Sequence, residues 1–173
     1  MILRPVTAAD LEPLSINQSP TENPWNFFGF QPSNSMSQRF AANGLLTEDA
    51  GVLAVQNETG QILGEVRYWA VRHSPVTAAR AVGIGITLLP EHRYQGHGAP
   101  AQDALARHLF ATTPVERIEA TVDVDNIAEQ KALQRAGFSQ EGVLRHAHFR
   151  AGRWHDVILY SRIRGDEPRP NNS

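Results

Sequence analysis

The order of the predicted elements is the feature that most constrains the fold of this chain. Apolar alternation predicts strands over 1–7, 51–56, 61–71, 80–89, 116–124, 138–148 and 153–163. Apolar periodicity and capping signals predict helices over 8–17, 35–43, 96–111 and 126–136. Antiparallel hairpins thus surround a single strand–helix–strand unit. This order predicts an α/β protein with a mixed sheet and helices rather than a doubly wound fold.

Composition narrows the class of protein further. The 173 residues suffice for one domain with a buried core. The absence of cysteine excludes disulfides, thiolate nucleophiles and cysteine-held metal clusters. A formal net charge of −2 gives no reason to expect nucleic acid or a membrane surface as partner. The first residues lack an apolar signal core and the longest apolar stretch, 81–90, is too short to cross a bilayer, so we expect a cytoplasmic protein.

The most informative segment runs from Ala81 to Ala99. In it a predicted strand leads into Arg93-x-x-Gly96-x-Gly98, and a predicted helix follows. Glycines let the backbone approach a ligand, and unpaired amides at a helix start bind phosphate oxygens. The residues alone leave three interpretations: a loop that needs glycine only for geometry, a dinucleotide-binding turn, or a pyrophosphate loop for coenzyme A. The dinucleotide fingerprint follows its strand at once and belongs to a repeated β–α–β array, and both features are missing here.

This loop resembles the acetyl-CoA loop of the GNAT N-acetyltransferases, usually written Q/R-x-x-G-x-G/A. Residues 126–138 look like the family's helix after its fifth strand, and residues 141–149 and 152–161 look like the last hairpin of the RimJ/RimL-type branch. The resemblance covers residues 50–164 well and 1–49 in outline. It implies a mostly antiparallel sheet of about seven strands with a splayed parallel pair and about four flanking helices. We expect one domain over 1–164, with an acceptor-side region at 18–49, and a flexible tail at 165–173.

The resemblance implies an acetyl-CoA-dependent N-acetyltransferase. In this function the acetyl group moves from the thioester to a primary amine by direct attack through a tetrahedral intermediate. The acceptor would be a small molecule or a protein N-terminus, acetyl-CoA would be the co-substrate without a metal, and a homodimer is a family expectation. The alternative is a catalytically weak acyl-CoA-binding sensor or scaffold of the same fold.

The resemblance also assigns the co-substrate contacts. It places the oxyanion-binding amide and the pantetheine contacts on the backbone of Ile86 and Leu88. The loop contacts would come from Arg93, Tyr94, Gln95, Gly96, His97, Gly98 and Ala99. Asn126 and Lys131 would contact the rest of coenzyme A, although a solvated helix charge equally describes Lys131. Gly83 and Gly85 suit either a bulge or packing beside a bulky neighbour.

Two titratable residues are candidates for acid–base chemistry. Relatives in the RimJ/RimL-type branch have a serine at the position of Glu129 and a glutamate at the position of His148, and a common family tyrosine is replaced by Leu133. The ordinary histidine pKa suits His148 as a general base, but a strand histidine beside His146 is the alternative. Glu129 could orient a water, or it could complete a capping box with Asn126.

The predicted acceptor side contains a cluster of aromatic residues. Trp25, Phe27, Phe28 and Phe30 lie within six positions. They could form an apolar wall for the acceptor, make a dimer contact, or pin the loop onto the sheet. This segment has no acidic cluster that would recruit a polycation. The histidines at 92, 97 and 108 lack a metal-ligand spacing, so we expect no metal.

Overall fold

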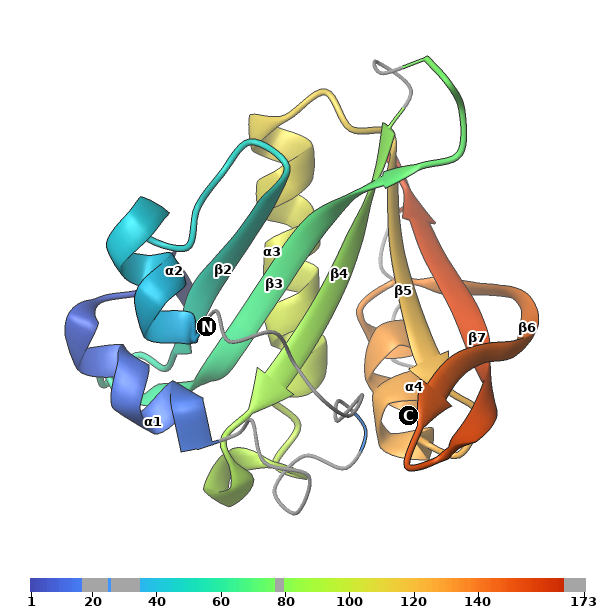
Figure 1. Cartoon of the computed structure of the whole chain (residues 1–173). Helices are drawn as coiled ribbons and strands as arrows, with labels where there is room; N and C mark the ends of the chain where they lie inside the picture. The colour runs from blue at the N-terminus through green and yellow to red at the C-terminus, as the bar shows by residue number, and fades with distance from the viewer. Residues whose placement is uncertain (17–24, 26–34, 77–79, 167–173) are drawn as a thin grey trace.

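A computed structural model describes residues 1–16, 25, 35–76 and 80–166 (Figure 1). The strands are β1 (Ile2–Pro5), β2 (Ala50–Gln56), β3 (Ile62–Arg72), β4 (Arg80–Leu88), β5 (Arg117–Asp123), β6 (Ser139–Arg150) and β7 (Arg153–Ile163). The α-helices are α1 (Leu11–Ile16), α2 (Met36–Asn43), α3 (Gly98–Thr112) and α4 (Ile127–Arg135), and short 3₁₀ turns lie at Ala8–Asp10 and Pro90–His92. Within these ranges, no helix combines the length and the apolar character that crossing a membrane requires.

The seven strands form one sheet in the order β1-β2-β3-β4-β5-β7-β6. Every neighbouring pair is antiparallel except β4 and β5, which are parallel and pair only at Val82 with Ile118 and at Gly83 with Glu119. Beyond these pairs the two strands separate toward their carboxyl ends (Figure 1). The predicted mixed sheet and the splayed parallel pair are therefore confirmed.

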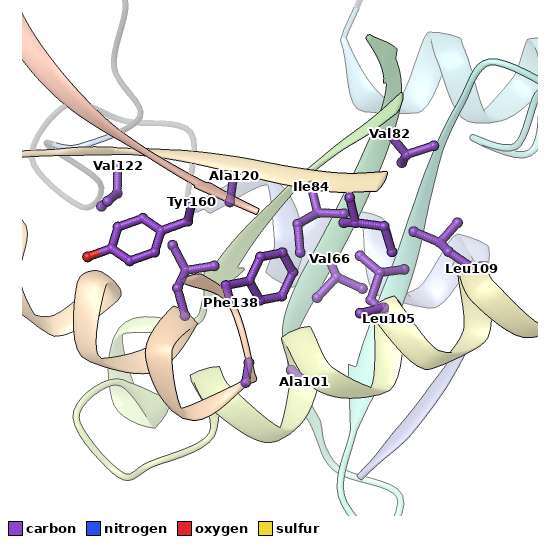
Figure 2. Close-up of a cluster of buried hydrophobic side chains, with 14 of the residues drawn as sticks. Val66, Val82, Ile84, Ala101, Leu105, Leu109, Ala120, Val122, Phe138 and Tyr160 are labelled. Atoms are coloured by element: carbon purple, nitrogen blue, oxygen red, sulfur yellow. The ribbon is translucent and has the colours of Figure 1, made fainter. Parts of the chain in front are cut away.

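Apolar side chains cover the two faces of the sheet unequally. The larger core lies between the sheet and helices α3 and α4, and it contains Val66, Ile84, Leu105, Phe138 and Tyr160 (Figure 2). A smaller core places α1 and α2 over β2, around Leu14, Val52 and Ala54. Because side chains alternate along a strand, the residues between these core positions on β3, β4 and β5 point away from α3 and α4.

We call this second surface of β3, β4, β5, β6 and β7 the polar face. Its described members include Glu65, Arg67, Thr87, Glu119, Asp123, His148 and His155, as the strand registers require. Glu65, Thr87, Glu119, Asp123 and His155 are buried although they are polar or charged. Buried polar groups need hydrogen-bond partners, so the polar face is a candidate location for a functional site.

The junction of β4 and β5 is covered by one aromatic side chain. Trp69 of β3 lies opposite Gly83 of β4, and a Cβ built on Gly83 would be 2.4 Å from the indole ring. A Cβ on Gly85 would meet the same ring at 3.5 Å. The structure thus explains these glycines by packing beside a bulky neighbour, and Trp69 rests where β4 and β5 are still paired.

We predict that Gly83→Ala destabilises the fold by about 1–3 kcal/mol, because the new methyl group overlaps the Trp69 ring. The measurement is urea unfolding with tryptophan fluorescence. Gly142→Ala is the matched control on β6, since a Cβ there has nothing within 4 Å. Equal stability of the two variants would contradict the role given to Trp69.

Candidate functional site

Beyond Gly83 the backbone groups of β4 that face β5 are not paired with that strand, and we call this separation of the two strands the opening. The N–H of Leu89 donates to the carbonyl of Leu63 on β3 at 2.9 Å. Backbone groups of successive strand residues point to opposite sides, so those of Leu88 and Ile86 point toward β5. The Leu88 carbonyl accepts a hydrogen bond from Arg93 Nε at 3.0 Å. An extended ligand could therefore add to this edge of β4 as a further strand does.

The loop from Pro90 to His97 leads from this edge to α3. Two residues in it have left-handed backbone, Tyr94 with φ 60° and Gly96 with φ 83°. Gln95 Nε2 donates to the carbonyl of Glu91 at 2.6 Å. The His97 ring lies edge-on to the buried ring of His92, with centroids 6.3 Å apart. The loop is thus held by its own contacts, while the Tyr94 side chain is 89% exposed.

The start of α3 packs closely against α4. A Cβ on Gly98 would be 3.3 Å from the Cβ of Ala132, so a small residue is needed at this contact. The first backbone N–H groups of a helix have no partner within the helix, and here they belong to Gly98 and Ala99, because Pro100 has no N–H. This end of α3 has the chemistry of an anion site. Lys131 is exposed on α4, beside Ala132.

Glu129 makes a different contact from the predicted capping box. Asn126 is the N-cap of α4, and its side chain accepts from the Glu129 N–H at 3.3 Å, which is one half of such a box. The Glu129 carboxyl instead hydrogen-bonds with Gln102 of α3. Burial raises the pKa of Glu129 to about 7, and the hydrogen bond from Gln102 opposes this rise. At neutral pH this carboxyl is present in both protonation states.

Gln102 links Glu129 to the loop. It is 1% exposed, and its Nε2 donates to the carbonyl of Gly98 at 3.3 Å. Among the described residues, its buried Oε1 has no hydrogen-bond partner.

A second cluster lies across the opening, at the end of β5 on the polar face. Asp123 accepts from the Asp125 N–H at 2.9 Å and from the guanidinium of Arg150, and His155 Nδ1 lies 3.1 Å from its Oδ2. Burial opposes ionisation of Asp123, but the Asp125 N–H and Arg150 hold the pKa of the carboxyl below its usual value. His148 is the cross-strand partner of His155.

Burial also changes the acid–base behaviour of His148. It lowers the pKa of the imidazole, and the positive charge of Arg150 acts in the same direction, while Asp123 raises it. His148 is therefore mostly neutral at pH 7 and able to accept a proton. Arg150 also lies over the ring of Trp25, with its Cζ 5.1 Å from the ring centroid.

The structure sorts the candidate residues onto two sides of the opening. Glu129 and Asn126 lie with the loop on the α3–α4 side, whereas His148 and Trp25 lie on the polar-face side. Phe27, Phe28 and Phe30 lie outside the described residues. Sequence reasoning missed Glu65, Asp123, Arg150 and His155. The available signal was charge within predicted strands that are otherwise apolar.

The described residues contain no group of three or more histidine, aspartate or glutamate side chains placed to hold a metal ion. Burial raises the pKa of Glu129 and lowers that of His148.

Comparison with known proteins adds independent information. The family described as Acetyltransferase (GNAT) domain matches residues 1–139. A Bacillus subtilis (strain 168) protein named Uncharacterized N-acetyltransferase YoaA is 28% identical over 174 residues, which cover 96% of this chain and 95% of that protein. Uncharacterized N-acetyltransferase p20 of Bacillus licheniformis is 32% identical over 81 residues, covering 47% of this chain and 46% of that protein.

Solved structures share the fold. Spermidine N-acetyltransferase from Vibrio cholerae, in complex with CoA and spermine, superposes with a TM-score of 0.80 at 18% identity, covering 95% of this chain and 96% of that one. Mycobacterium smegmatis RimJ, in complex with CoA-disulfide, has a TM-score of 0.74 at 23% identity, covering 96% and 83% of the two chains.

We predict that Glu129→Gln stabilises the protein at pH 8 by about 1–3 kcal/mol. The folded-state pKa of Glu129 is raised, so the folded protein binds more protons than the unfolded chain between the ordinary glutamate pKa and about 7. Stability from this group is present at low pH and is lost as the pH rises through 7, whereas glutamine carries no such charge.

The measurement is urea unfolding of both proteins at pH 4.5 and pH 8. The matched control is Glu58→Gln, which changes an exposed carboxylate in the β2–β3 turn and should shift stability by less than about 0.5 kcal/mol at either pH. A Glu129→Gln variant that gains no stability at pH 8 relative to pH 4.5 would show that the carboxyl is not buried as described.

Proposed function

The chain belongs to the GNAT acetyltransferase family, and from this membership we propose that it transfers an acetyl group from acetyl-CoA to a primary amine of a small molecule or a protein N-terminus. The observation that carries the proposal is the separation of β4 from β5, with His148, whose pKa is lowered, on the polar face and Glu129, whose pKa is raised, on the α3–α4 side. The spermine in the Vibrio cholerae structure is itself an amine, which supports an amine acceptor for this fold.

Acetyl-CoA would supply the acetyl group as a thioester, and the residues of the loop fit its diphosphate. Gly96 has a backbone that favours glycine and open space where a side chain would be, so a ligand can approach its amide. The amides of His97, Gly98 and Ala99 continue this surface into the positive end of α3. Arg93, Tyr94 and Gln95 shape the approach, and Lys131 adds a cation beside it.

The remaining contacts follow the opening. The backbone of Ile86 and Leu88 would hydrogen-bond the extended pantetheine arm, and an amide there would stabilise the oxyanion. Asn126 caps α4 on the same side, next to Glu129. The acceptor would enter from the polar face, where Trp25 and His148 lie.

The proton balance assigns a role to each titratable residue. The amine nitrogen forms a bond to the acetyl carbon, and the carbon–sulfur bond breaks. His148 accepts the proton that the amine loses, because its lowered pKa keeps it neutral at pH 7. Glu129 donates a proton to the departing thiolate, because its raised pKa keeps part of it protonated. The two groups return to their starting states by exchange with water.

We predict that His148→Ala lowers kcat/KM for amine acetylation by about 10²- to 10⁴-fold, which is the usual contribution of a general base. The assay follows thiol release from acetyl-CoA with a panel of primary amines and N-terminal peptides. The wild-type rate should fall toward low pH with a midpoint below 6.5, because His148 loses its function only when it is protonated. Thermal shift by coenzyme A should be unchanged.

The matched control is His108→Ala, which removes an exposed ring on α3 and should leave kcat/KM within about 3-fold. Equal rates for the two variants would remove His148 from the mechanism. Binding of coenzyme A without thiol release across the whole panel would instead favour the acyl-CoA sensor.

We predict that Gly96→Ala weakens coenzyme A binding by about 10-fold or more, because an alanine disfavours φ 83° and displaces the loop amides. Gly165→Ala is the matched control, since Gly165 has φ 93° and equally open surroundings but lies after β7. Both variants should lose about 1 kcal/mol of stability. Calorimetric titration with coenzyme A separates them, and equal affinities would place the diphosphate elsewhere.

A further inference from the structure

Glu65 of β3 is a buried carboxylate with one unused oxygen. The residue is 3% exposed, and its Oε1 accepts a hydrogen bond from the guanidinium of Arg67. The same guanidinium nitrogen lies 3.3 Å from the Thr87 hydroxyl. Glu65 Oε2 is buried and has no hydrogen-bond partner in the part of the chain that the structure describes. Arg67 is itself partly exposed, so this ion pair lies at the boundary between the sheet and the outside.

The registers place Glu65 beside the opening. Its cross-strand partner on β4 is Thr87, between Ile86 and Leu88, so Glu65 lies one strand away from the exposed backbone edge. The β4–β5 pairs Val82 with Ile118 and Gly83 with Glu119 set a constant offset along the two parallel strands. Continuing that offset puts Thr87 at the height of Asp123. Glu65 and the Asp123 cluster therefore flank the same opening on the polar face.

The free energy of burial argues against a purely structural role for this carboxylate. An unpaired buried oxygen of a charged group is unfavourable, and an apolar residue of similar size would avoid that cost. Glu119 shows how the same face satisfies a buried carboxylate, because His73 Nε2 lies 2.6 Å from its Oε1 and Arg117 Nε also donates to it. The open oxygen of Glu65 is thus suited to a donor that arrives with a ligand.

The surrounding charges limit what that donor can be. Each carboxylate beside the opening already has one guanidinium, Arg67 for Glu65 and Arg150 for Asp123. One unused carboxylate oxygen between two guanidinium groups can accept from one further cation. A ligand with several positive charges would meet Arg67 and Arg150 as like charges.

We propose, resting on the function proposed above, that Glu65 Oε2 is the subsite that binds the ammonium group of the acceptor and that it selects amines with a single positive charge. The ammonium group donates to Oε2 on the β3 side of the opening and then loses one proton to water. The resulting amine attacks the acetyl carbon, and the second proton that its nitrogen loses passes to His148 of β6. Glu65 binds and orients the acceptor.

The test compares wild type with Glu65→Gln, using n-butylamine as the substrate and n-butylguanidinium as an unreactive cation. The variant should raise the KM for n-butylamine by about 10- to 100-fold and leave kcat within about 3-fold, as the loss of one charge-assisted hydrogen bond predicts. Calorimetry in the presence of coenzyme A should give a matching loss of affinity for n-butylguanidinium. The coenzyme A thermal shift should be unchanged.

Two further variants keep the result interpretable. Glu119→Gln changes the other buried glutamate of the polar face, and it should affect stability without raising the KM. Glu65→Asp keeps a carboxylate, and it should give an intermediate KM even if Glu65→Gln fails to fold. In wild type, n-butylamine should have a higher kcat/KM than spermidine.

The outcomes separate this inference from the proposed function. An unchanged KM in Glu65→Gln, or the same KM in Glu65→Asp as in wild type, overturns the subsite while acetyl transfer stands. A higher kcat/KM for spermidine overturns the selection for a single charge. Absence of thiol release with every amine overturns the proposed function, and n-butylguanidinium binding that Glu65→Gln abolishes would still support a cation subsite.

Discussion

The separation of β4 from β5 is the constraint on which the rest of the site depends. The two parallel strands share only two residue pairs, and the Trp69 ring lies over the last of them at Gly83. Beyond that pair the backbone N–H and C=O groups of β4 and β5 are not paired with each other. Burying backbone N–H and C=O groups without hydrogen-bond partners is unfavourable. A ligand or water that hydrogen-bonds to this edge of β4 removes that cost. The edge that is costly to the fold is the same edge that can bind an extended substrate.

Burial shifts the pKa values of the groups on the two sides of this opening in opposite directions. A buried carboxyl resists ionisation and a buried imidazole resists protonation, so the pKa of Glu129 rises while that of His148 falls. Burial thus leaves a partly protonated carboxyl on the α3–α4 side and a neutral imidazole on the polar face. In the proposed reaction the two residues need no direct contact, because each would serve a different atom.

Local signals made much of this architecture predictable. Ser35 caps α2, Gly44 ends it with φ 63°, and the segment 81–99 forms the strand, loop and helix that its glycines indicate. Contacts between distant segments were not predictable. Glu129 has the spacing of a capping box, yet its carboxyl meets Gln102 from another helix. The position of Glu65 depends on strand register, because a slip of one residue would place its side chain on the other face of the sheet.

Strand register also determines on which face of the sheet His148 lies. Along β6 and β7, Leu144 pairs with Val157, and the next pair is His148 with His155. Four positions on β6 thus correspond to two on β7, and the extra residues leave the ladder at a bulge where His146 has φ 50° and its N–H donates to Asp156 at 2.8 Å. Because the excess is an even number, His148 returns to the polar face. An insertion of one residue would have turned the imidazole away from Asp123, so the bulge positions the His148 side chain.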